Sequence, residues 1–130
     1  MLPEIDIQRI KSVVLQRKEI SYAILFGSAM KRLLAHSDVD LLVGGDLDRE
    51  MKTDLLVALA LQVHRPIDIV LTKESQCDVV LKAFSSGVLL VVQDRRRMKE
   101  DYFEHYRRCD EARSLRMTKL ERLKRVYRNG

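Results

Sequence analysis

Three aspartates stand in apolar segments where acidic residues are unusual. Asp38 and Asp40 begin the segment DVDLLV, and Asp68 lies inside PIDIVL. Asp is depleted from β-strands, so two strand-like segments that contain it need a chemical reason. Because side chains alternate along a strand, Asp38 and Asp40 project to the same side, about 7 Å apart. Two such carboxylates repel each other unless a cation lies between them, and oxygen ligands without His or Cys favour magnesium or manganese.

Asp68 occupies the same kind of position in its own strand-like segment. Alternation places its carboxylate on the face opposite the side chains of Ile67 and Ile69. If the two segments are neighbouring strands, three carboxylates converge. Three converging carboxylates suit a two-metal transfer of a phosphoryl or nucleotidyl group, in which the ions hold a triphosphate and stabilise charge on the attacking and leaving oxygens.

A glycine and a serine precede the aspartates and add a candidate phosphate-binding turn. Gly27 and Ser28 follow the apolar segment SYAILF, and a glycine lets the backbone approach a phosphate closely. The N-terminus of a short helix expected next would present unpaired N–H groups to an anion. Lys31 or Arg32, one turn further on, would reach phosphate oxygens. Each residue alone also fits an ordinary turn or surface position, but their combination favours a site.

The elements that would position these residues alternate between helix and strand. Hydrophobic periodicity predicts helices over residues 6–18, 31–34, 48–63 and 75–84, strands over 21–26, 38–43, 67–71 and 88–92, and a helical tail from residue 95. The candidate helix caps are Asp6, Asp46 or Asp48, and Ser75 with Asp78. This order indicates an α/β or α+β structure in which helices pack on a small sheet.

Several turn residues lead to more detailed expectations. Gly44 and Gly45 are predicted to close the second strand as a turn. Gly87 fits the position after a helix end, where a left-handed backbone is needed. Thr118 and Glu121 form a capping-box pattern, so the tail is predicted to be two helices with a bend near residue 117.

The positive charge belongs to the tail. The chain has a formal net charge of +5, with 24 Lys and Arg against 19 Asp and Glu. Residues 93–130 hold 13 of these basic and 7 of these acidic residues, so residues 1–92 hold 11 and 12. We therefore interpret the chain as a near-neutral core, 1–92, with a basic helical tail, 93–130, packed on it within a single domain. The tail carries an apolar stripe at helical spacing: Met98, Tyr102, Tyr106, Cys109, Ala112 and Leu115.

Composition also bears on the cellular setting. No apolar run approaches the roughly 20 residues of a membrane-spanning helix, and acids occupy the N-terminal segment where a signal peptide needs a basic lead. We therefore expect a soluble cytoplasmic protein that does not bind membranes. Cys77 and Cys109 lack a metal-type spacing, and in that compartment they are expected to be reduced thiols.

The motifs together resemble a known family. The string FGSAMKRLLAHSDVDLLV over residues 26–43, followed by PIDIVL over 66–71, resembles the minimal nucleotidyltransferases (MNT) of the DNA polymerase beta superfamily. The likeness covers the core to about residue 92, and the basic, tyrosine-bearing tail resembles that of the MNT antitoxins, the partners of HEPN toxins. It implies an α+β polymerase-beta-like fold, a small mixed sheet with helices packed on it and a helical C-terminal tail.

The resemblance also implies roles for the site residues. Gly27 and Ser28 would hold the triphosphate, Asp38 and Asp40 would bind both metal ions, and Asp68 would bind one ion and help activate the attacking hydroxyl. Two Mg²⁺ ions are implied, with Mn²⁺ as an alternative, together with ATP as donor, AMP as the transferred group and a tyrosine of a HEPN toxin as acceptor. The spacer over residues 29–37 is one residue shorter than the commonest antitoxin pattern and lacks its Arg-Gly. Because the metal ligands are intact, we favour an active enzyme.

Other functions stay open at this stage. The chain is alternatively an antitoxin that neutralises its partner by binding alone, through the tail stripe, or a nucleotidyltransferase that acts on a small hydroxylated molecule. Nucleic acid is a poor candidate partner, since aromatic residues are few and the basic cluster at residues 95–97 is short. Both homo-oligomers and hetero-oligomers are compatible with the sequence.

The metal-site assignment leads to a direct prediction. Asp38→Asn should abolish nucleotide transfer, because the substitution removes an anionic ligand from the proposed metal pair. Transfer is measured with labelled ATP and magnesium. Activity retained by a clean preparation of the variant would contradict the assignment.

Overall fold

The computed structural model describes residues 2–27 and 39–129 of the 130-residue chain. Their strands form one sheet in the order β3-β2-β1-β4. The strands are β1 (Ile20–Phe26), β2 (Val39–Gly45), β3 (Ile67–Leu71) and β4 (Val88–Val92). The helices are α1 (Glu4–Leu15), α2 (Arg49–Gln62), α3 (Cys77–Ser86) and α4 (Arg95–Asn129), with a 3-10 turn at Thr72–Glu74. The expected helix at residues 31–34 lies outside the described residues.

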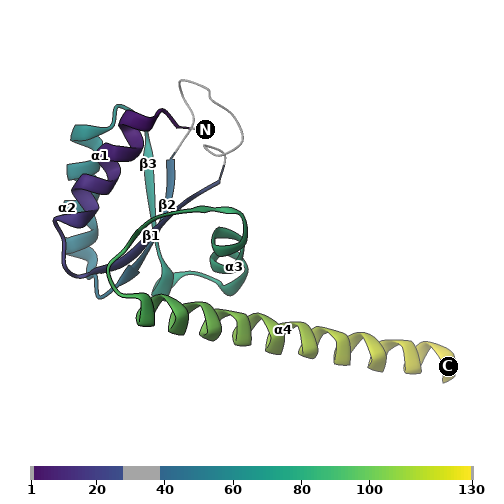
Figure 1. The fold of residues 1–130 in the computed structure, drawn as a ribbon. Helices are drawn as coiled ribbons and strands as arrows, with labels where there is room; N and C mark the ends of the chain where they lie inside the picture. Colours follow the sequence, from purple (N-terminus) through teal and green to yellow (C-terminus); the bar gives the residue numbers. More distant parts are fainter. Residues whose placement is uncertain (1, 28–38, 130) are drawn as a thin grey trace.

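The sheet is mixed. β1 runs antiparallel to both of its neighbours, β2 and β4, whereas β2 and β3 are parallel. A parallel pair needs a crossover connection, and α2 supplies it between β2 and β3. α1 and α2 lie on one side of the sheet, and α3 and α4 lie on the other (Figure 1). The predicted α+β class with a small mixed sheet is confirmed.

Alternating side chains divide the core into two layers. One face of the sheet packs against α1 and α2, and its buried strand residues include Ala23, Leu25, Leu41, Val43 and Ile69. The other face packs against α3 and the start of α4, with Tyr22, Ile24, Leu42, Val80 and Ala83 buried there. Because alternate side chains point to opposite faces and helices cover both faces of the sheet, the central strands are apolar on both faces.

Local differences from the sequence-based expectations have simple causes. Asp48 caps α2 as one of the predicted alternatives, and its carboxylate accepts a hydrogen bond from the Met51 N–H at 2.8 Å. α1 begins earlier than predicted, so Asp6 lies in its first turn while Pro3 is the N-cap. β2 continues through Gly44 to Gly45 rather than ending in a turn there, because antiparallel pairing with β1 extends to Ile20.

Two predictions around α3 are wrong. Gln76, not Ser75, is the N-cap of α3, and the Ser75 hydroxyl instead donates to the Leu71 carbonyl at 2.7 Å. Gly87 has φ −83° and ψ 175°, which is extended rather than left-handed backbone. A glycine is needed there for close approach, since a Cβ atom would collide with the carbonyl oxygens of Ala83 and Leu25.

α4 is one helix of 35 residues, so the predicted bend near residue 117 is wrong. The Thr118 hydroxyl donates to the carbonyl of Ser114 at 3.0 Å, within the continuous helix, rather than capping a new one. No glycine or proline occurs between Arg95 and Asn129 to break it. None of the described helices has the length and apolar character needed to cross a membrane.

A disulfide joins Cys77 at the start of α3 to Cys109 in α4, so the expectation of reduced thiols is corrected. The packing of the two helices brings the Cα atoms to 5.6 Å, which is within the range that a disulfide spans. The cysteines are 32 residues apart on different helices, so their spacing in the sequence carried no sign of the contact.

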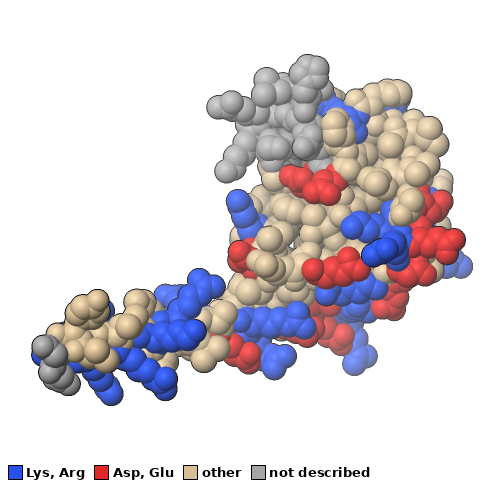
Figure 2. Space-filling view, turned by 180° about the vertical axis from the view of Figure 1, so that it is seen from behind, with Lys and Arg blue, Asp and Glu red and all other residues tan. Residues whose placement is uncertain are grey.

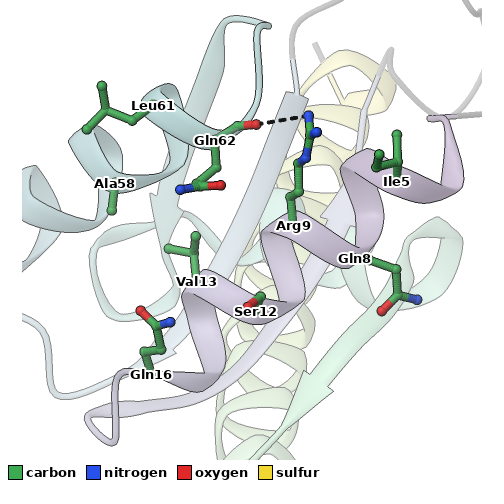
Figure 3. A pocket seen from close by; sticks show the side chains of 9 residues that line it. All are labelled: Ile5, Gln8, Arg9, Ser12, Val13, Gln16, Ala58, Leu61 and Gln62. Atoms are coloured by element: carbon green, nitrogen blue, oxygen red, sulfur yellow. Dashed lines mark hydrogen bonds between the residues drawn. The ribbon is translucent and has the colours of Figure 1, made fainter.

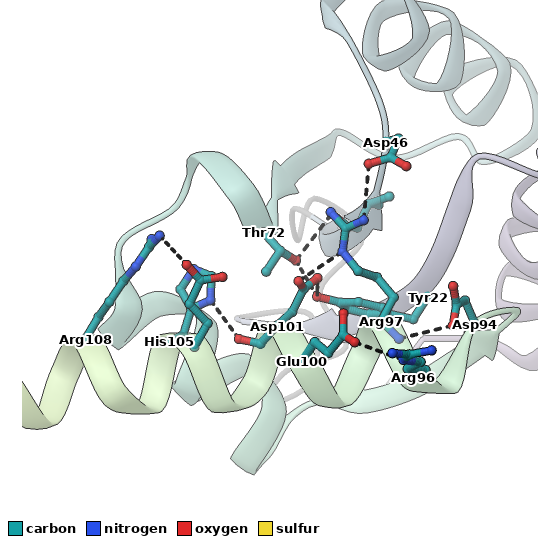
Figure 4. A network of polar contacts seen from close by, with 12 residues as sticks. Tyr22, Asp46, Thr72, Asp94, Arg96, Arg97, Glu100, Asp101, His105 and Arg108 are labelled. Carbon is teal, nitrogen blue, oxygen red and sulfur yellow. Dashed lines mark hydrogen bonds and ion pairs between the residues drawn. The ribbon is translucent and has the colours of Figure 1, made fainter.

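A buried tyrosine joins the sheet to α4 (Figure 4). The Tyr22 hydroxyl donates to the carboxylate of Asp101 at 2.8 Å and lies 2.8 Å from its second partner, the hydroxyl of Thr72. Arg97 binds the same Asp101 at 3.1 Å and reaches Asp46, beyond the end of β2, at 3.2 Å. Burial raises the pKa of Tyr22 above its ordinary value, with a smaller contribution from the Asp101 charge. The cluster ties β1, the ends of β2 and β3, and α4 together.

Tyr22→Phe should lower the free energy of unfolding by about 1–3 kcal/mol, because Thr72 and Asp101 lose a buried hydrogen-bond partner. Denaturant unfolding measures the change. Tyr127→Phe is the matched control: its ring is 85% exposed, and we expect a change within about 0.5 kcal/mol. Equal effects of the two substitutions would contradict the prediction.

The raised pKa of Tyr22 adds a pH signature. As pH rises past about 10, the unfolded chain releases the tyrosine proton while the folded chain retains it, which favours unfolding. The stabilising contribution is complete below about pH 10 and declines above it. The free energy of unfolding of the unsubstituted protein should therefore fall more steeply above this pH than that of Tyr22→Phe. Parallel pH profiles would contradict this.

Candidate active site

The candidate site lies at one end of the three strands β1, β2 and β3. Because β1 is antiparallel to β2, and β2 is parallel to β3, the last residue of β1 lies beside the first residues of the other two. Phe26 is the register partner of Asp40, and Gly27 follows directly. The topology therefore brings the glycine turn at the end of β1 and the aspartate-bearing starts of β2 and β3 to the same end of the sheet (Figure 1).

The register of β2 and β3 places Asp40 directly opposite Asp68. Residues paired in this way on parallel strands project from the same face, and neighbouring strands lie about 4.8 Å apart. The face is the one that carries Leu42 and Val70, two residues further along each strand, toward α3. Asp40 is half-buried and Asp68 is exposed. The expectation that these strands are neighbours is confirmed, and two of the three predicted carboxylates come together.

Gly27 makes room for one of these carboxylates. Its φ is +89°, a backbone conformation that disfavours other residues. The Asp40 carboxylate occupies the place that a side chain at position 27 would take. The sequence suggested a glycine for phosphate approach, and the contact with Asp40 is a second reason that only the structure shows.

The donor chemistry of this pair fits a hard divalent cation. Carboxylate oxygens at neighbouring strand positions, without a His or Cys among them, are the ligands that Mg²⁺ and Mn²⁺ take. Among the residues that the structure describes, no three His, Cys, Asp or Glu side chains are grouped to hold a metal. The predicted third carboxylate, Asp38, and the predicted phosphate-binding residues Ser28, Lys31 and Arg32 lie outside the described residues.

Phe26 lies beside the candidate site, and the sequence reasoning did not single it out. It is half-buried, belongs to the apolar cluster under α3, and pairs with Asp40 across the strands. Its ring therefore continues the row of side chains in which Asp40 and Asp68 lie. Alternation along SYAILF was the signal that could have placed it on this face.

A separate hollow lies on the other side of the sheet, between α1 and α2 (Figure 3). Its volume is about 430 Å³. Its lining residues are Ile5, Gln8, Arg9, Ser12, Val13, Gln16, Ala58, Leu61 and Gln62. The lining offers amides, a hydroxyl and one guanidinium, which donates to the Gln62 carbonyl at 3.4 Å, but no carboxylate. Its chemistry does not suit a metal ion, so the strand edge is the better candidate site.

The chain is similar to known proteins in sequence profile and in fold. The sequence profile of the family described as "Polymerase beta, Nucleotidyltransferase" matches residues 8–96, a range that contains Asp40 and Asp68. No match to a curated protein was found.

Solved structures share the fold. A toxin–antitoxin structure with AMP-PNP aligns with a TM-score of 0.73 at 16% identity, over 90% of this chain and 97% of that one. An MNT antitoxin in complex with a tri-AMPylated HEPN toxin of Shewanella oneidensis aligns with a TM-score of 0.69 at 16% identity, over 91% and 95% of the chains. The MntA–HepT structure gives 0.70 at 14% identity, over 93% and 98%. At these identities the likeness shows the polymerase-beta-like fold.

Gly27→Ala should disturb the site by two routes. The new methyl group would displace the Asp40 carboxylate, and the left-handed backbone would add strain of about 1–2 kcal/mol. We expect lower stability in denaturant unfolding and weaker binding of Mn²⁺, measured by electron paramagnetic resonance of the free ion. Ser85→Ala, at an exposed position of α3, should change neither. Unaltered Mn²⁺ binding by Gly27→Ala would show that the Asp40 position does not matter for the cation.

Proposed function

The chain belongs to the polymerase beta nucleotidyltransferase family, whose profile matches more than half of its length, and we propose that it transfers AMP from ATP to a tyrosine hydroxyl of a HEPN-type toxin. The observation that carries the proposal is the register that sets Asp40 against Asp68. An aspartate pair on adjacent strands, beside a glycine turn, supplies carboxylate oxygens that suit the metal ions of nucleotidyl transfer.

We assign the residues as follows. Asp38 and Asp40 hold two Mg²⁺ ions, or Mn²⁺ in their place, and Asp68 holds one of them. Gly27, Ser28, Lys31 and Arg32 bind the triphosphate. When bound, the metal ions would neutralise the triphosphate and stabilise the charge that develops at the reacting phosphorus.

Position within the sheet separates the roles of the two described aspartates. Asp40 is half-buried on β2, an inner strand, and its carboxylate lies against Gly27. Asp68 is exposed on β3, an edge strand. An acceptor hydroxyl that approaches from solvent can therefore reach Asp68 more easily than Asp40. Asp68 is the group that orients this hydroxyl and accepts its hydrogen bond, while Asp40 stays a fixed ligand.

The proposed acceptor and donor follow from the structural relatives. One of these structures holds an AMPylated HEPN toxin with an MNT antitoxin, and another holds AMP-PNP. We assign residues 1–92 to the catalytic core and residues 93–130 to the tail, which leaves the acceptor tyrosine to a second protein. We place the pair in the cytoplasm, where ATP is available. The Cys77–Cys109 disulfide is unusual for that compartment, where thiol systems keep most cysteines reduced.

Labelled ATP tests the proposal. The protein is incubated with Mg²⁺, ATP labelled at the α-phosphorus, and the product of the neighbouring reading frame, which we expect to be a HEPN-type toxin. Label should move to the partner, and Asp40→Asn or Asp68→Asn should lower the rate about 100-fold or more, because each removes an anionic ligand. Asp54→Asn is the matched control, since this exposed aspartate of α2 pairs with Arg17 on the other side of the sheet.

Other results of these experiments would point to a different function or contradict the metal site. Neutralisation of the partner without transfer of label, unaffected by Asp40→Asn, would identify an antitoxin that acts by binding alone. Label that appears on a small hydroxylated molecule and not on the partner would reassign the acceptor. Equal rates for Asp40→Asn and Asp54→Asn would contradict the metal site.

A further inference from the structure

The side of α4 that packs against the core stays apolar beyond the last residues that contact the core. Met98, Cys109 and Leu120 are spaced eleven residues apart, which is three helical turns and therefore one side of the helix. Met98 packs on the apolar cluster beneath α3, and Cys109 is bonded to Cys77 of α3. Leu120, on the same side, is 51% exposed. α4 extends beyond the sheet and α3 (Figure 1), so its apolar side continues where the described core has ended.

The exposed continuation is a substantial apolar surface. We call it the projecting stripe, and its members are Leu115, Leu120, Leu123, Val126 and Tyr127. All of them are more than half exposed, and Tyr127 reaches 85%. Single exposed leucines are ordinary, but five large apolar side chains along one side of residues 115–127 are typical of an interaction site. The predicted tail stripe is therefore divided: Met98, Tyr102, Cys109 and Ala112 lie partly buried against the core, whereas Tyr106 and the part from Leu115 onward are exposed.

Positive charge surrounds this stripe. Residues 113–128 contain seven Lys and Arg and one acid, Glu121. Blue side chains follow the projecting end of the helix in Figure 2. A second copy of the chain would bring two such segments together, and like charges across an interface oppose association. The occupant that matches both features is an amphipathic surface with an apolar centre and an acidic rim.

The shape of the region favours a narrow occupant. Where α4 leaves the core, the start of α3 overhangs it and forms a corner with a hollow of about 350 Å³. Asp78, Arg108, Ala112 and Arg116 are among its lining residues. The disulfide lies at this corner and joins the two helices there. A single helix fits along such a corner. A flat bilayer does not, and a nucleic acid supplies phosphates without apolar side chains for the stripe.

We propose that residues 113–128 of α4 are a docking arm for an acidic amphipathic helix of a partner protein. Apolar residues of that helix pack on the projecting stripe, as in helix-in-groove recognition, and its Asp and Glu side chains pair with the Lys and Arg on the stripe's side of α4, such as Arg116, Lys119 and Lys124. The identity of the partner as the HEPN-type toxin rests on the proposed function. The arm then binds the toxin at a place separate from the aspartate pair that modifies it.

Leu120→Ser with Leu123→Ser tests the arm. Both leucines are exposed in the free protein, so the circular dichroism spectrum and melting temperature should be unchanged. Calorimetric titration with the product of the neighbouring reading frame, the expected HEPN-type toxin, should show at least about tenfold weaker binding. Glu121→Ser with Arg125→Ser is the matched control, because it changes two exposed residues on the other side of the helix and also preserves net charge. It should leave the affinity within about twofold.

Two readouts separate the arm from the proposed function. Weaker binding by the leucine variant supports the arm even if the unsubstituted protein transfers no label. Unchanged binding by the leucine variant overturns the arm even if label transfer is intact. The arm is also overturned if the leucines are needed instead for self-association in sedimentation, for binding phosphatidylserine-containing vesicles, or for binding single-stranded RNA while toxin binding is unaffected.

Discussion

The parallel pairing of β2 with β3 is the constraint on which the candidate active site depends. It sets Asp40 opposite Asp68 and turns both to the same face. A slip of one residue would move one carboxylate to the face that packs against α1 and α2, among Leu41, Val43 and Ile69. The same apolar side chains that would be exposed by such a slip therefore hold the two carboxylates in register. Hydrophobic burial positions the polar pair.

The opposite ends of the same two strands are held by a polar cluster. Asp46 follows β2 and Thr72 follows β3, and both connect through Arg97 or Tyr22 to Asp101 on α4. Tyr22 comes from β1, the strand whose other end leads into Gly27. The hydrogen bonds and ion pairs at this end and the aspartate pair at the other thus share one set of strands. Movement of the strands against one another would break buried contacts, so the carboxylate edge is carried by a rigid support.

α4 uses one apolar surface for two purposes. Its first turns pack Met98 and Tyr102 on the face of the sheet that carries the aspartate pair, and its last turns present the projecting stripe to solvent. The disulfide to α3 lies between the packed part and the exposed part of the helix. Because the helix is continuous, a partner held on its far end would be held in a defined direction relative to the sheet. Recognition and chemistry would then be coupled through one rigid element.

Local patterns in the amino-acid sequence determine much of this protein by themselves. The limits of β3 and β4, and the alternation that turns Asp40 and Asp68 to a common face if their strands are neighbours, follow from neighbouring residues. Neighbouring residues also narrow the cap of α2 to Asp46 or Asp48, of which the structure uses Asp48. The tertiary structure decided the rest. Only packing shows that Cys77 meets Cys109, that Gly87 is required by the carbonyls of Ala83 and Leu25, and that the stripe of α4 outlasts the core. Periodicity shows which side of a helix is apolar, but it carries no information on how far along the helix other parts of the protein pack against that side.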